Sequence, residues 1–146
     1  MFGGKRVDLA FIDGMHWFEF AVRDFAHVER WASKGSVVVL HDCLPVSRVA
    51  ARRDRASTFW VGDVWKALEC VLDRRPDLTV HVVPTAPSGL VVVRRLDPSS
   101  QVLFEEASAI DARYRNSEYP HEPGAWPERY GMVQNTEAGL ARALGV

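Results

Sequence analysis

The sequence lacks several features that mark specialised classes of protein. Only 2 of its 146 residues are cysteines, Cys43 and Cys70, and their spacing is neither that of a redox pair nor that of a zinc site. It has no run of ~20 apolar residues that could span a bilayer, and no stretch typical of a signal peptide. Its formal net charge of -1 supplies no field for nucleic acid or an anionic membrane. We therefore expect a cytoplasmic protein with free thiols and no nucleic-acid or membrane partner.

Familiar catalytic motifs are missing as well. The sequence has no Gly-x-Ser-x-Gly elbow, no Walker loop and no HExxH segment, which argues against serine hydrolases, nucleotide hydrolases and zinc proteases. Arginines gather at positions 48, 52, 53 and 55, but they sit among Asp54 and small residues, so a solvated loop or helix face is favoured over a phosphate or nucleic-acid site. With 47% hydrophobic and 25% charged residues, the chain has the composition of an ordinary globular domain.

Two short apolar runs separated by an amphipathic segment predict a strand–helix–strand unit. The first strand is expected over 7–12 and the second over 36–40, both buried on two faces. Between them, apolar residues recur every three or four positions and predict a helix over 17–33, ended by Lys34-Gly35. Such a unit has parallel strands, which places this chain in the α/β class.

The rest of the chain predicts a loop, a helix, a hairpin and an extension. A loop is expected over 45–58, followed by a helix capped by Asp63 and ending near 75–76. Strands over 78–83 and 90–94 are joined by a short turn, so they must pair antiparallel. A weaker helix capped by Ser99 or Ser100 closes a domain over 1–110. Residues 111–146 are expected to form an irregular extension rich in aromatics and proline, with a short helix over 136–144.

Acidic and imidazole side chains follow both strands of the first unit. Asp13, Gly14 and His16 come after the first strand, and His41 and Asp42 after the second. Because the carboxyl ends of parallel strands meet at one edge, these clusters predict a site there. Asp13 and Asp42 together would suit Mg²⁺ or another hard cation.

Each residue of this proposed site also has an alternative explanation. Asp13 can equally serve as a helix N-cap, and His16 is either a general base or an exposed first-turn residue. His41 is a ligand, a base or a structural group, and neighbouring residues of an extended chain should point to opposite sides. Side-chain hydrogen bonds within a turn are the other explanation for His41 and Asp42.

Aromatic and polar residues at the start of the next helix suggest a pocket. Trp60, Asp63 and Trp65, with His16, are candidates for binding a substrate, although core packing and helix capping explain the first three nearly as well.

Three phrases carry a resemblance to a known family. They are FIDGMH at 11–16, LHDCLP at 40–45 and WVGDVWK at 60–66. In this order, over about 7–98, the chain resembles the second half of a class I S-adenosylmethionine-dependent methyltransferase. The resemblance implies a partial Rossmann-like sheet whose parallel strands end in an antiparallel hairpin strand, flanked by helices. It also implies S-adenosylmethionine as cofactor, bordered by Asp13 and Gly14, and a role for Asp13 in binding a divalent cation or the acceptor. The implied reaction is O-methylation of a small metabolite or sugar, with His16 or His41 as base.

The chain also departs from that family. Similar enzymes have three earlier strands with a glycine-rich cofactor turn, and Gly3-Gly4 is not preceded by a strand that would make it such a turn. The strand at 7–12 is therefore expected at a sheet edge, with Trp17, Phe18 or Phe20 exposed, inviting a second copy or a partner chain. The alternatives to an enzyme are a truncated, non-catalytic module that depends on a partner and, less favoured, a metal-dependent hydrolase using the Asp/His cluster.

Overall fold

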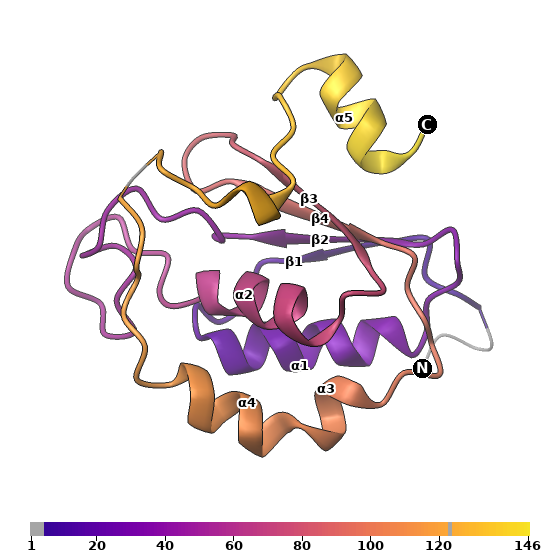
Figure 1. Cartoon of the computed structure of the whole chain (residues 1–146), viewed down its shortest axis with the longest axis horizontal. Helices are drawn as coiled ribbons and strands as arrows, with labels where there is room; N and C mark the ends of the chain where they lie inside the picture. The colour runs from indigo at the N-terminus through magenta and orange to yellow at the C-terminus, as the bar shows by residue number, and fades with distance from the viewer. Residues whose placement is uncertain (1–4, 123) are drawn as a thin grey trace.

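A four-stranded mixed sheet carries the proposed site, and helices cover both of its faces (Figure 1). The computed structural model describes residues 5–122 and 124–146, so Gly3 and Gly4 lie outside the described residues. The elements are β1 (Leu9–Ile12), α1 (Phe18–Glu29), β2 (Val37–His41), α2 (Trp65–Arg74), β3 (Thr79–Val83), β4 (Leu90–Arg94), α3 (Val102–Glu105), α4 (Ala107–Tyr114), the 3₁₀ turn η1 (Glu128–Tyr130) and α5 (Glu137–Leu144).

The strand order is β1-β2-β4-β3, with β1 parallel to β2 and β4 antiparallel to both of its neighbours. β4 thus returns from β3 and inserts beside β2. This arrangement confirms the α/β fold and the antiparallel hairpin strand that the resemblance implied. The parallel β1–β2 pair, with Ile12 opposite Leu40, brings the carboxyl ends of the two strands together.

The core on one face of the sheet lies under α1 and α2. It contains the fully buried side chains of Phe18, Phe25, Leu40 and Leu68. The expectation that Phe18 is exposed is wrong, because Tyr114 of α4 packs against its ring with centroids 6.4 Å apart. Trp17 and Phe20 are partly buried.

A buried ion pair joins the ends of both core helices. The carboxylate of Glu29 accepts hydrogen bonds at 2.5 and 2.9 Å from the guanidinium of Arg75, and another at 3.0 Å from the backbone N–H of Asp97. Both side chains are at most 3% exposed. Glu29 therefore fixes the carboxyl ends of α1 and α2 against the chain that leaves β4.

The opposite face of the sheet is covered only in part. α5 and the segment around Val133 pack over β3 and β4, on the side away from α1 to α4 (Figure 1). On β1, Leu9 and Phe11 remain 64% and 59% exposed. The prediction that this strand is buried on both faces is wrong, because β1 is an edge strand and α5 does not reach it. A second copy or partner chain at this edge stays a prediction.

The C-terminal segment is more regular than expected. α4 continues to Tyr114, so helix crosses the boundary placed at 110–111, and α3 begins after Gln101 rather than after a serine cap. The short terminal helix is confirmed: the side chain of Thr136 caps α5 by accepting from the N–H of Gly139. Tyr130 is fully buried in the main core, so the segment after 111 packs onto the domain. Among the described residues, no helix is long and apolar enough to cross a membrane.

Candidate active site

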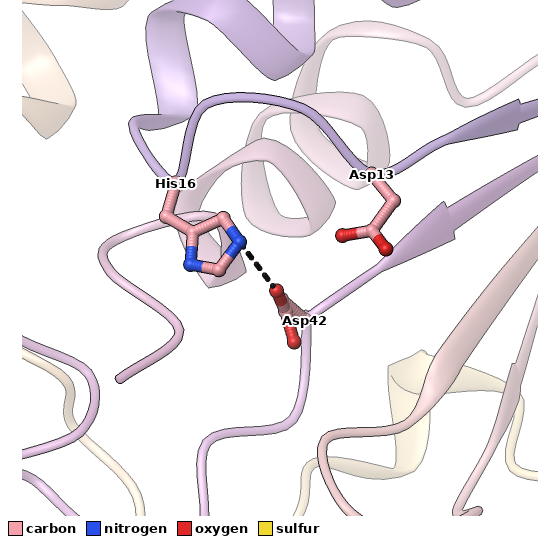
Figure 2. Close-up of side chains that lie close together, drawn as sticks. All are labelled: Asp13, His16 and Asp42. Atoms are coloured by element: carbon pink, nitrogen blue, oxygen red, sulfur yellow. Dashed lines mark ion pairs between the residues drawn. The ribbon is translucent and has the colours of Figure 1, made fainter. Parts of the chain in front are cut away.

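Three side chains from two loops converge at the carboxyl edge of the parallel strands (Figure 2). Asp13 follows β1, His16 lies just before α1, and Asp42 follows β2. One ligand atom of each lies within 4.8 Å of the other two. The Nε2 atom of His16 is 3.1 Å from a carboxylate oxygen of Asp42. The convergence predicted from the sequence is therefore present, and His16 joins the two carboxylates as a third candidate ligand.

The ring of His16 is held in one orientation by the chain that precedes α2. Its Nδ1 lies 3.1 Å from the backbone carbonyl of Trp60 and its Nε2 lies 3.1 Å from the carboxylate of Asp42, and both of these oxygens only accept. Both contacts are satisfied together when each ring nitrogen carries a proton, or when a cation takes the place of the proton at Nε2. A lone pair facing a carboxylate repels it unless a proton or a cation occupies Nε2. A metal-bound histidine usually donates from its other ring nitrogen to a carbonyl or carboxylate, and the contact of Nδ1 with Trp60 fits that arrangement.

A glycine allows this loop to approach so closely. Gly62 has a positive φ of 64°, and a Cβ there would lie 1.8 Å from the backbone oxygen of His16. The N–H of Asp63 donates to that same oxygen at 3.1 Å. The loop before α2 thus contacts both the backbone oxygen and the ring of His16.

Asp42 is buried and held by a residue that sequence analysis missed. Ser88, in the hairpin turn between β3 and β4, donates its hydroxyl to Asp42 at 2.5 Å and is 1% exposed. Asp42 has a φ of 63°, in the left-handed region that aspartate tolerates better than most residues. Ser88 is 46 residues from Asp42 in the chain, and no local pattern connects them.

His41 lies among the carboxylates rather than on the far side of the strand. Its Nδ1 is 3.2 Å from Asp42 and 3.4 Å from Asp13. The expectation that His41 and Asp42 point to opposite sides is wrong, because the positive φ of Asp42 interrupts the extended backbone. The Nε2 atom of His41 lies 3.4 Å from the hydroxyl of Ser88, but that hydroxyl is buried and directs its proton at Asp42.

Asp13 does not act as a helix cap. The N-cap of α1 is Trp17, and no side chain caps it from that position. The N–H of Phe18, the first residue of α1, instead donates at 2.9 Å to Asp63, 45 residues away. Asp13 keeps a side chain that is 41% exposed and contacts His41. The capping explanation for Asp13 is therefore wrong.

Asp63 and Trp65 lie away from this cluster. Asp63 was expected to cap α2, but the N-cap of α2 is Val64, and the Asp63 carboxylate is bonded to Phe18, Lys66 and Arg53. Trp65 is 3% exposed and packs with Ala51 and Tyr119.

Trp60, by contrast, lies beside His16, with ring centroids 5.2 Å apart. Of the three residues predicted at the start of α2, the structure brings only Trp60 to the site.

A buried thiol next to the cluster is unsuited to nucleophilic chemistry. Burial raises the pKa of Cys43, and the negative charge of Asp42 raises it further. Its Sγ–H is directed at the carbonyl of His41 at 3.5 Å. Because the thiolate is the reactive form, Cys43 is a packing residue.

Two cavities flank the cluster, and Gly14 borders both. One, of about 500 Å³, is lined by Phe11–Gly14 at the end of β1 and by Asp24, His27, Val28 and Trp31 of the following helix segment. The other, of about 390 Å³, is lined by Gly14, Met15, His16, Trp17, Arg55 and Trp60.

Comparison with known proteins agrees with this geometry. The family model of a methyltransferase domain matches residues 1–43, the segment that holds Asp13, His16, His41 and Asp42. This segment is therefore similar to the methyltransferase domain. No curated protein and no solved structure matched the chain. The match to the methyltransferase domain ends one residue after Asp42, so Trp60 and Ser88 are placed at the site by the structure alone.

Proposed function

We propose that the chain performs methyl transfer from S-adenosylmethionine to a hydroxyl oxygen of a small molecule, assisted by a divalent cation. The observation that carries this proposal is the convergence of Asp13, His16 and Asp42 between two cavities, in a segment similar to the methyltransferase domain. Neither observation alone would suffice, because acidic clusters occur without function and similarity to a family does not specify a reaction.

The donor set fits a hard or borderline cation such as Mg²⁺ or Mn²⁺. Two carboxylates and one imidazole nitrogen supply three ligands, and the remaining positions stay open for water or an acceptor oxygen. The hydrogen bonds to Trp60 and Ser88 provide the outer support that ligands of a metal site require. A bound cation would polarise the acceptor hydroxyl and favour its deprotonated form.

The residues of this chain position the two reactants. His41 directs its Nδ1 at both carboxylates, 3.2 Å from Asp42 and 3.4 Å from Asp13. Asp13 and Gly14 border the larger cavity, which we assign to S-adenosylmethionine. His16 borders the smaller cavity, which we assign to the acceptor. Alignment of the two reactants is the main source of rate enhancement in such a transfer.

Calorimetric titration with S-adenosylhomocysteine tests the proposal, with and without Mg²⁺. We expect micromolar binding to the wild-type chain, weaker binding to Asp13→Asn, and unchanged binding to Asp8→Asn, whose carboxylate is exposed at the other end of β1. Failure to bind at millimolar ligand, with the fold verified by circular dichroism, would refute methyl transfer by this chain alone. Binding of the cation without the nucleoside would favour the metal-dependent hydrolase instead.

A further inference from the structure

The smaller cavity has walls that are apolar for a specific structural reason. The indole N–H of Trp60 donates to the carbonyl of Arg52 at 2.7 Å, and that of Trp17 donates to the carbonyl of Arg53 at 3.3 Å. Both indoles thus use their single polar atom on the arginine-rich loop. The guanidinium of Arg53 lies 4.7 Å from the centroid of the Trp17 ring, and the ring of His16 packs beside Trp60. The remaining carbon surface of both indoles is left for a ligand, and Met15 adds a thioether side chain that is 54% exposed. Such a wall suits a flat, apolar ring.

The same loop places one unpaired cation in this cavity. Arg48 is paired with Glu122, and Arg53 is bound by both oxygens of Glu19. Arg55 donates to the carbonyl of Thr58 at 3.2 Å, and among residues 5–122 and 124–146 no carboxylate is paired with it. A guanidinium with free N–H groups at the rim of an apolar cavity is well suited to a carboxylate or phosphate.

These features together specify a class of acceptor. We propose that this cavity binds an aromatic ring that carries a hydroxyl group and an anionic substituent, such as a phenolic carboxylate. The ring lies against Trp17 and Trp60, the anion pairs with Arg55, and the hydroxyl faces His16, the member of the cluster that lines this cavity. This inference rests on the proposed function, because the hydroxyl is taken to be the methyl acceptor.

A sugar fits the same walls less well. A sugar ring carries several hydroxyls, each of which loses stability when it is buried without a partner. Arg55 and His16 are the charged or titratable side chains that line this cavity, and His16 already uses its Nδ1 on Trp60. An aromatic ring with one hydroxyl and one anion matches this small set of polar groups.

Calorimetry with three probes in the presence of Mg²⁺ tests the inference on the full chain. The probes are para-hydroxybenzoate, its neutral analogue para-hydroxybenzyl alcohol, and methyl glucoside. We expect the acid to bind about tenfold more tightly than the alcohol, as one charge-assisted interaction allows. The preference should vanish in Arg55→Gln and persist in Arg52→Gln, an equally exposed arginine of the same loop that does not line the cavity. Met15→Glu should abolish binding of the acid, whereas Met15→Leu should not.

Equal affinity for acid and alcohol, loss of the preference in Arg52→Gln, or tighter binding of the glucoside would overturn the inference. Titration of the same samples with Mg²⁺ and S-adenosylhomocysteine tests the methyl-transfer function separately from the class of acceptor. If both bind and no probe does, the acceptor class is wrong and the proposed function stands. If the acid binds with the expected preference and S-adenosylhomocysteine does not, the methyl-transfer function fails and the anion-binding cavity stands.

Discussion

Replacing Asp42 with asparagine should remove the response to a divalent cation while keeping the fold. Asparagine tolerates the left-handed backbone at this position, where φ is 63°. Its amide oxygen can still accept from Ser88, and its amide N–H can donate to Nε2 of His16 when that nitrogen carries no proton. Without a cation, the variant should therefore melt at the same temperature as the wild type or slightly above it.

The size of the cation effect follows from linkage. At a concentration one hundred times its dissociation constant, a cation that binds only the native state adds about 2.7 kcal/mol to the free energy of unfolding. With an unfolding entropy of about 2.1 cal/mol/K per residue, this added free energy raises the melting temperature of a 146-residue chain by about 9 °C. Loss of an outer-shell partner weakens metal sites by about 10–100-fold. Asp42→Asn removes the charge of a direct ligand, so it should weaken binding by at least about 100-fold. At the same cation concentration, the rise in melting temperature should then be only about 1 °C.

Thermal melts followed by circular dichroism provide the assay, with Mn²⁺ titrated against a chelator-treated sample. Asp8→Asn is the matched control, because it removes a carboxylate at the other end of β1 and should keep the full shift. The reasoning is refuted if the wild-type chain shows no stabilisation at any Mn²⁺ concentration. It is equally refuted if Asp42→Asn retains the shift, or if Asp8→Asn loses it.

Three further outcomes follow from named contacts. Ser88→Ala removes the hydroxyl that orients Asp42 and should weaken Mn²⁺ binding about tenfold in calorimetry; it should also lower the melting temperature of the chelated protein, because a buried carboxylate loses a donor. Glu29→Ala removes the buried partner of Arg75, which keeps its hydrogen bonds to the exposed carboxylate of Asp77, and should lower the free energy of unfolding in urea by about 2 kcal/mol, whereas no loss would contradict the buried-pair interpretation. Burial raises the pKa of Cys70 to about 12, so a thiol reagent at pH 8 should react with the native protein far more slowly than with protein unfolded in urea.

The fold was predictable where the signal is local. The apolar periodicity before Lys34 predicted α1, the short turn after β3 predicted the antiparallel hairpin, and Thr136 predicted the start of α5. Burial was less predictable, because it depends on what covers each face. The apolar run of β1 is typical of a central strand, yet Leu9 and Phe11 are exposed, since α5 packs over β3 and β4.

The site was predictable in its two carboxylates and less so in the groups that hold them. Parallel strands end at one edge, so Asp13 and Asp42 were expected together. Ser88 and the carbonyl of Trp60 reach the site from other parts of the chain, and neither has a sequence signal of its own. The role of Asp63 was also unpredictable from local sequence. Its position predicted a cap for α2, but its carboxylate accepts a hydrogen bond from the first N–H of α1.

Structural roles account for some residues of the cluster and not for others. Asp42 is buried and hydrogen-bonded to Ser88, and a turn-stabilising role would explain that much. Asp13 neither caps α1 nor lies buried, and its carboxylate faces His41 and the cavity at the end of β1. His16 is held by Trp60 so that its Nε2 faces the carboxylate of Asp42, an arrangement that a proton or a cation at Nε2 stabilises. A proton there gives a structural ion pair and leaves the position of Asp13 unexplained, whereas the proposed cation would use Asp13 as a further ligand and would require ligands that are rigidly supported and partly exposed.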